Sequence, residues 1–198
     1  MFYKITLLLF SVLLVGAAYG QNAAFGIKGG PSVTAFGGLD NGFSPRLAYH
    51  AGLFTRRSIN EKIKTQTELT YSLQGAQDQF ISEFRFNYSY VNLAMLVNVN
   101  IGQGIFVDLG GQGGYLVSAK SRTGVFKDDV RDNVNKWDYA LVGGLSYYFN
   151  ERVSFAGRYN YGLRATATGA PDRNSRFPNR VFQFTVFYVL GSKGNSSD

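Results

Sequence analysis

The feature that most constrains this chain is an unbroken alternation of side-chain character across residues 62–74. Successive side chains of a β-strand point to opposite faces, so a period of two predicts a strand. One face would carry Ile63, Thr65, Thr67, Leu69, Tyr71 and Leu73, and the other Lys64, Gln66, Glu68, Thr70, Ser72 and Gln74. The stretch is longer than the usual strand of a globular protein, which has about 5–6 residues. It approaches the length that a tilted strand needs to cross a bilayer.

The same period predicts seven more strands. They span residues 24–34, 46–57, 87–99, 105–119, 136–149, 152–164 and 180–190. No segment of the mature chain shows a helical period. A chain that stays in a membrane without such helices must cross it with strands.

The connections between these strands alternate in length. Residues 35–45, 75–86, 120–135 and 165–179 are long, whereas residues 58–61, 100–104 and 150–151 are short. Outer-membrane barrels have long external loops and short periplasmic turns. We therefore expect an all-β fold, an eight-stranded antiparallel up-and-down transmembrane β-barrel in the bacterial cell outer membrane.

Aromatic residues gather near the strand ends. Tyr88, Tyr90, Tyr115, Trp137, Tyr139, Tyr159 and Tyr161 lie toward the long loops, and Phe54, Phe106, Tyr147, Phe149, Phe187 and Tyr188 lie toward the short turns. Two such bands are typical of the aromatic girdles at the two membrane interfaces. Adjacent residues point to opposite faces, so only part of this set can face lipid.

The N-terminus has the pattern of a secretory signal. Lys4 precedes an apolar run at residues 5–15, and Ala18 and Gly20 supply small residues before Gln21. This pattern predicts cleavage before Gln21, with an uncleaved anchor as the alternative. The expected organisation is a signal peptide at 1–20, a barrel domain at 21–190 and a short polar tail at 191–198.

Composition narrows the function classes. The chain has no cysteine, which excludes disulfides and thiolate metal sites. Its net charge of +7 could suggest nucleic acid, but the positive residues are scattered and the chain is expected to leave the cytoplasm. We expect outer-membrane lipid and lipopolysaccharide as partners, no nucleic acid, no cofactor and no metal.

Six short segments, taken in order, carry a family resemblance. They are His50-Ala-Gly-Leu-Phe54, Glu68-Leu-Thr-Tyr-Ser-Leu-Gln-Gly-Ala76, Tyr90-Val-Asn-Leu93, Gly114-Tyr-Leu-Val-Ser-Ala-Lys120, Arg158-Tyr-Asn-Tyr-Gly-Leu163 and Asn179-Arg-Val-Phe182. The series resembles the PorT-like outer-membrane β-barrel family of Bacteroidota, although Ala94 stands where many relatives carry a proline. The resemblance implies an eight-stranded barrel and little about activity. The association of the family's founding branch with type IX secretion is not transferred to this chain.

The face opposite the apolar one carries charges of both signs. Strand parity places Lys28, His50, Lys64, Glu68, Asp108, Asp138 and Arg158 on it. Glu68 and Arg158 lie equally far from their short turns, on the third and seventh strands, so they should meet across the lumen. Buried charges must pair. We therefore predict a structural polar cluster of Glu68, Arg158, Lys64, Asp108 and His50.

Other motifs leave alternatives open. The single His50 could serve as a catalytic base if a serine lay within reach, and the glycines at residues 110–114 look like a phosphate loop but lack its Lys and helix. The acidic residues near Asp129 suit either calcium or a solvated loop. Arg164, Arg173, Arg176 and Arg180 could meet lipopolysaccharide phosphates.

These observations favour a non-enzymatic surface barrel with loops for envelope or surface interactions. The alternatives are a membrane-embedded lipid A deacylase or acyltransferase and a narrow ion channel.

Overall fold

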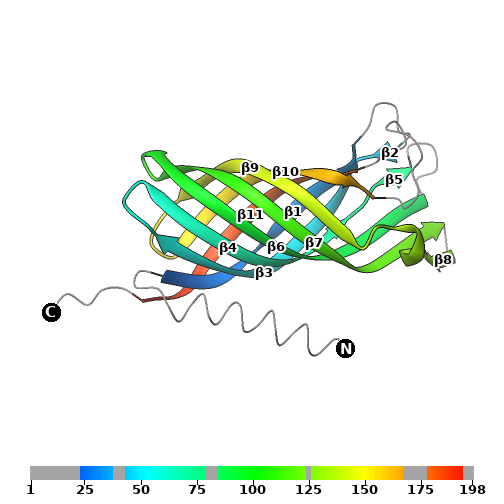
Figure 1. The fold of residues 1–198 in the computed structure, drawn as a ribbon, viewed down its shortest axis with the longest axis horizontal. Coiled ribbons are helices and arrows are strands. Elements are labelled where there is room, and N and C mark those ends of the chain that lie inside the picture. Colours follow the sequence, from blue (N-terminus) through cyan, green and yellow to red (C-terminus); the bar gives the residue numbers. More distant parts are fainter. Residues whose placement is uncertain (1–22, 38–42, 79–83, 124–125, 167–177, 194–198) are drawn as a thin grey trace.

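The computed structural model describes residues 23–37, 43–78, 84–123, 126–166 and 178–193. Within these ranges eight long strands form the fold (Figure 1). They are β1 (Ala23–Phe36), β3 (Arg46–Ser58), β4 (Ile63–Gln74), β6 (Phe84–Gly102), β7 (Ile105–Thr123), β9 (Trp137–Tyr148), β10 (Val153–Ala165) and β11 (Pro178–Lys193). Each corresponds to one predicted strand, so the expected all-β class is confirmed. Short elements lie between them, namely β2 (Phe43–Ser44), β5 (Gln77–Asp78), β8 (Phe126–Asp129) and a 3₁₀ turn (Arg131–Asn133).

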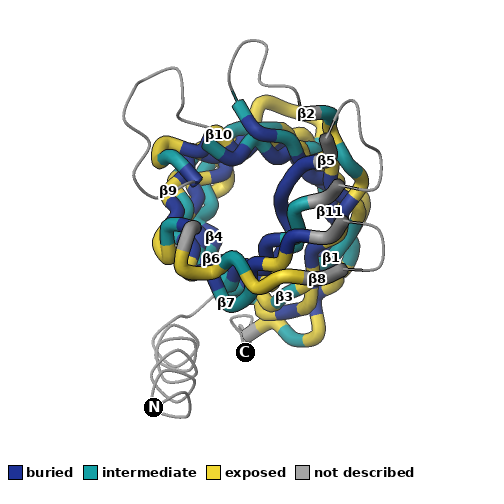
Figure 2. Tube along the Cα trace, turned by 90° about the vertical axis from the view of Figure 1, so that its right-hand side faces the viewer, coloured by how far each residue is buried: buried dark blue, intermediate teal, exposed yellow. Residues whose placement is uncertain are grey.

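The eight long strands close into a barrel. Each pairs antiparallel with its neighbours along the chain, and β1 pairs with β11 to complete the ring (Figure 2). Closure leaves no unpaired strand edge in the wall. The predicted signal peptide lies outside the described residues, and β11 continues to Lys193, three residues past its expected end.

Asparagines build two of the short turns. The side-chain Oδ1 of Asn60 accepts hydrogen bonds from the backbone N–H of Lys62 and Ile63, at 2.9 and 2.8 Å. Asn150 repeats the arrangement with Arg152 and Val153, at 2.9 and 2.7 Å. Such side-chain turns reverse the chain within a few residues. We call this end of the barrel the inner end, and the end that carries β2, β5 and β8 the external end (Figure 1).

β6 and β7 extend beyond the other strands at the external end. Each has 19 residues, and a register shift between Ser89 and Tyr90 bends their pairing. Beyond the shift, β5 pairs with β6 and β8 pairs with β7. These short strands lie in stretches that the sequence predicts as loops.

The outward face of the wall is apolar. Exposed large side chains alternate with buried ones, as for Leu47, Met95 and Leu141, which are more than half exposed. Among the described residues, no helix has the length and apolarity needed to span a membrane. The glycines at residues 110–114, considered as a phosphate loop, all lie within strand β7.

The two aromatic bands divide between the faces. Tyr115, Trp137, Tyr139, Tyr147, Phe149, Tyr159, Tyr161 and Tyr188 are exposed on the outside, whereas Phe54, Tyr88, Tyr90, Phe106 and Phe187 are buried. The buried rings point to the same face as the polar residues two positions away, as Phe54 does with Arg56 and Phe106 with Asp108. Assignment of those five rings to girdles is therefore wrong, and they belong to the interior.

Candidate functional site

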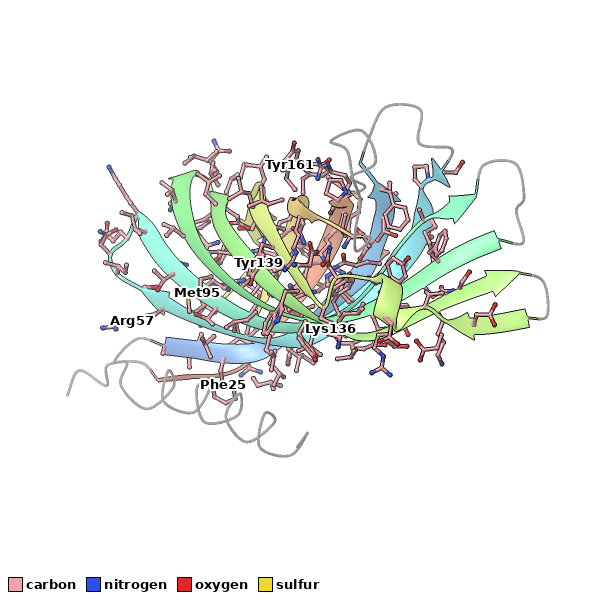
Figure 3. The ribbon with its side chains drawn as sticks, turned by 45° about the vertical axis from the view of Figure 1, so that its right-hand side comes forward. Phe25, Arg57, Met95, Lys136, Tyr139 and Tyr161 are labelled. Carbon is pink, nitrogen blue, oxygen red and sulfur yellow. The ribbon has the colours of Figure 1, made fainter. Side chains whose placement is uncertain are left out.

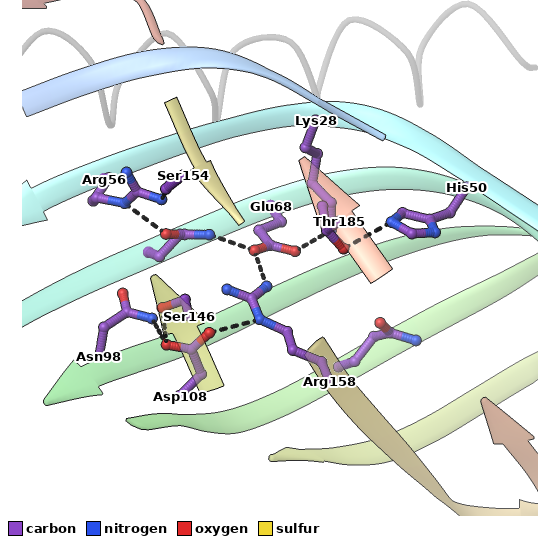
Figure 4. Close-up of polar contacts among 12 residues, drawn as sticks. Lys28, His50, Arg56, Glu68, Asn98, Asp108, Ser146, Ser154, Arg158 and Thr185 are labelled. Carbon is purple, nitrogen blue, oxygen red and sulfur yellow. Dashed lines mark hydrogen bonds and ion pairs between the residues drawn. The ribbon is translucent and has the colours of Figure 1, made fainter. Parts of the chain in front are cut away.

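A charged cluster crosses the middle of the lumen (Figure 4). Arg158 of β10 donates from Nη1 to Oε1 of Glu68 on β4 at 2.5 Å, and from Nε to Oδ2 of Asp108 on β7 at 2.8 Å. Lys28 of β1 donates to Oε2 of Glu68 at 2.5 Å. All four side chains are buried. The cluster thus ties four strands of the barrel together through its interior.

Both carboxylates of the cluster are surrounded by donors. Besides Lys28 and Arg158, Glu68 receives the Nε2 of Gln66 at 2.5 Å. Asp108 receives Asn98 Nδ2 at 2.6 Å and Ser146 Oγ at 2.9 Å in addition to Arg158. Hydrogen bonds to ionised groups are roughly twice as strong as neutral ones. A buried network of charge-assisted hydrogen bonds of this kind favours one arrangement of the interior.

A glycine beside Arg158 makes room for its long side chain. Gly144 on β9 has inward parity, and a Cβ atom there would lie 2.8 Å from both Cα and Cγ of Arg158. The guanidinium carbon also lies 5.0 Å from the centre of the Phe187 ring. The site therefore depends on a small residue on one side of Arg158 and an aromatic ring on the other.

The structure brings together three of the five residues expected in the cluster. Glu68, Arg158 and Asp108 are joined directly. Lys64 instead lies over two rings, 4.7 Å from the centre of Phe106 and 4.2 Å from that of Tyr148. Lys28 joins the cluster in place of Lys64. The inward parity of Lys28 was the sequence signal for this position.

His50 has its own pair of partners. Its Nδ1 lies 2.9 Å from Ser32 Oγ, and its Nε2 lies 2.9 Å from Thr185 Oγ1. A serine is therefore within reach of the ring, as a catalytic base would require. However, a hydroxyl occupies each ring nitrogen, and His50, Ser32 and Thr185 are each 2 % exposed or less. The ring bridges β1, β3 and β11 from a position buried in the lumen.

An apolar layer fills the external part of the lumen. Its buried members are Phe36, Ala76, Tyr88, Tyr90, Leu116, Ala119 and Val134. Val134 follows the 3₁₀ turn, so the segment between β8 and β9 contributes to the layer. Charged residues thus lie in the middle of the lumen, and apolar residues pack together toward this end.

A second aromatic layer lies toward the inner end. Phe54 and Phe187 meet edge to face at 5.1 Å, and Phe106 and Tyr148 lie 4.4 Å apart. The guanidinium carbon of Arg56 lies 4.3 Å from the centre of the Tyr148 ring. Cations over aromatic faces are stabilised by the ring quadrupole.

Aromatic and cationic residues also meet on the outside near the external end. Tyr115 and Trp137 contact each other at 5.0 Å, and Arg180 lies 3.7 Å from the centre of Tyr161. Lys136, labelled in Figure 3, is exposed and directly precedes Trp137 in the chain. It borders a cavity of about 390 Å³ that Asp129 and Arg131 also line.

The acidic and basic loops are described in part. Asp129 is exposed and pairs with Arg131 at 3.8 Å. Arg164 is exposed and donates to Asn135 Oδ1 at 3.2 Å. Arg173 and Arg176 lie outside the described residues.

Comparison with known proteins gives a consistent picture. The sequence model of a family described as "Outer membrane protein beta-barrel domain" matches residues 19–167. Neisserial surface protein A (NspA) has a similar structure, with a TM-score of 0.60, 10% identity, and coverage of 84% of this chain and 97% of that one. The attachment invasion locus protein Ail of Yersinia pestis has a TM-score of 0.52 and 11% identity, covering 86% of this chain and all of that one. No curated protein sequence matches the chain.

Proposed function

The chain belongs to the outer membrane protein beta-barrel domain family, and from this premise we propose that it is a non-enzymatic barrel with a closed lumen whose external end contacts the envelope. Its place in the bacterial outer membrane follows from the family and from the eight-stranded fold shared with NspA and Ail. The observation that carries the proposal is the Arg158 cluster, which spans the lumen from β10 to β4 and β7.

Two features support a closed lumen. An eight-stranded barrel is just wide enough for side chains to fill it. Here Arg158 bridges the middle, and Tyr88, Tyr90 and Leu116 pack in the external part. Ions would have to break charge-assisted hydrogen bonds and pass an apolar layer.

Conductance separates the closed barrel from the channel alternative. Purified protein in planar bilayers should give no current steps above the lipid background. The double variant Glu68→Ser with Arg158→Ser removes only the bridge, so the apolar layer at the external end should still keep the barrel closed. Steady conductance of the unmodified barrel would contradict the proposal.

A lipid assay addresses the enzyme alternative. The protein is incubated with lipopolysaccharide, and lipid A is examined by mass spectrometry for loss or transfer of acyl chains. We expect unchanged lipid A, because Ser32 and His50 are buried away from lipid. Deacylation that disappears in Ser32→Ala would overturn the non-enzymatic assignment.

We propose that the external surface binds lipopolysaccharide phosphates. Arg180 lies over the outward ring of Tyr161, and the exposed Lys136 directly precedes the outward Trp137 in the chain. These rings lie at the level expected for an interface girdle. Lys136→Gln with Arg180→Gln should reduce stabilisation of the barrel by lipopolysaccharide, measured as the shift in thermal midpoint. Arg57→Gln, an exposed change near the inner end, is the control. Equal shifts in all three proteins would exclude this surface.

Export and orientation complete the proposal. We infer cleavage before Gln21, periplasmic turns at Asn60 and Asn150, and external loops around Asp78, Asp129 and Arg173. N-terminal sequencing of membrane-fractionated protein and protease added to intact cells test these points. Recovery as soluble periplasmic protein, or cleavage near Asn150 in intact cells, would contradict them. Membership of the PorT-like branch of Bacteroidota rests on the six short segments, and neighbouring genes would test it.

A further inference from the structure

The central and inner parts of the lumen carry more positive than negative charge. Among the described side chains there, the cations are Lys28, Arg56, Lys64 and Arg158, and the carboxylates are Glu68 and Asp108. Arg158 pairs with both carboxylates, and Lys28 pairs with Glu68. Within the described part of the chain, neither Arg56 nor Lys64 forms an ion pair.

These two cations converge on one ring. Arg56 lies 4.3 Å and Lys64 4.2 Å from the centre of Tyr148. The other partners of Arg56 are neutral, namely Gln66 Oε1 at 2.8 Å and Ser154 Oγ at 3.2 Å (Figure 4). The layer around Tyr148 therefore brings two cations together, and neither is within ion-pair distance of a carboxylate of the described residues.

Unused donors lie in the same region. The Tyr148 hydroxyl is buried and has no hydrogen-bond partner among the described residues. The Nη2 of Arg158, which is 2 % exposed, also lacks one. A buried polar atom without a partner costs free energy, and the Tyr148 hydroxyl is placed to donate to an acceptor that a ligand brings.

A counter-charge would lower the cost of this arrangement. A cation over an aromatic ring gains about 2 kcal/mol or more when desolvated, which does not neutralise it. Unpaired buried charges are penalised strongly, and like charges repel. We propose that the inner end of the lumen binds a small inorganic anion beside Tyr148, held by Arg56, Lys64 and the Tyr148 hydroxyl.

The proposed site lies close to the inner end of the barrel. Lys64 is only partly buried and is the second residue of β4, next to the inner turn. Arg56 is buried. It lies opposite Gln66, which is two residues farther from the inner turn than Lys64. A small anion can enter from the periplasm and stop below the Arg158 cluster, where it completes the closure of the lumen.

Bromide diffraction tests the site directly. Crystals of the full barrel are soaked in sodium bromide and measured at the bromine absorption edge. The proposal predicts an anomalous peak beside Tyr148, within contact distance of Arg56 and Lys64. Water alone at this position would overturn it.

Thermal unfolding in detergent tests whether the anion acts in solution. Chloride replaces gluconate at constant ionic strength, and the midpoint should rise by several degrees, because a ligand that binds only the folded state stabilises it. Lys64→Met should remove most of this rise. Lys62→Met, an exposed change in the adjacent turn, should keep it.

Each remaining outcome counts against the site. A bromide peak without any chloride dependence would show binding at crystal concentration only. An equal chloride dependence in Lys64→Met and in the unmodified barrel would show a general salt effect. If Lys64→Met does not fold, the diffraction result on the unmodified protein decides.

Discussion

The two faces of the barrel wall are held by different forces, although the same strands form both. On β4, Glu68 points inward and makes hydrogen bonds to Lys28, Arg158 and Gln66. Its neighbour Leu69 points outward, between Leu53 and Leu93 on the adjacent strands. The inward face depends on partners at fixed positions, whereas the outward face depends mainly on apolar character. On the inward face, the effect of a substitution should therefore depend on which partner is lost. On the outward face, it should depend on whether the new side chain is apolar.

The largest expected effect is the loss of Arg158. Arg158→Met keeps much of the side-chain volume but leaves Glu68 and Asp108 without their shared cation. Breaking a buried ion pair from one side costs about 3–5 kcal/mol. Urea unfolding in lipid vesicles should show a loss of this size. A loss below about 1 kcal/mol, the size of a single neutral hydrogen bond, would mean that the cluster does not hold the barrel.

A charge on the outward face should cost somewhat less. Leu69→Arg places a cation in lipid and should destabilise by about 2–4 kcal/mol near the membrane midplane. Leu69→Ala is the control, because it shortens the side chain but keeps it apolar. Equal, mild effects from the two changes would show that this face does not contact lipid.

The smallest change in stability is expected for a single hydrogen bond on the outward face. Tyr71 donates from its hydroxyl to Ser89 Oγ at 2.9 Å. Tyr71→Phe keeps the ring and removes this hydrogen bond, so we expect a loss of about 0.5–1.5 kcal/mol. The same unfolding assay measures it. A loss as large as that of Arg158→Met would contradict the distinction between the faces.

The sequence was sufficient for the strands because alternation and turn residues are local. The stretch at residues 62–74 became β4 with one residue trimmed, and Asn60 and Asn150 mark turns that their own side chains close. The same parity separates Phe106 from Ile105, and it identifies Phe106 as an inward residue. Its assignment to a girdle is wrong because a position near a strand end does not decide which face a side chain points to, whereas parity does.

Contacts across the lumen were harder to predict. Arg158 and Glu68 could be paired because both lie seven residues past a glutamate in a short turn. Which cation joins them depends on the tilt and stagger of the strands, which fix relative depth in a barrel. Lys28 and Lys64 share the inward parity, but only Lys28 reaches Glu68. The bond from His50 to Thr185 joins residues 135 positions apart and has no local signal.

A double-mutant cycle on Glu68 and Arg158 tests the central claim, that paired charges across the lumen stabilise the barrel. The cycle compares Glu68→Gln, Arg158→Met and the double variant by urea unfolding in vesicles. Residues in one buried network show interaction energies of about 0.5–3 kcal/mol. We expect the double variant to lose clearly less than the two single losses combined, because each single variant leaves a buried charge without its partner. Strictly additive losses would show that Glu68 and Arg158 do not stabilise each other, and they would contradict this account.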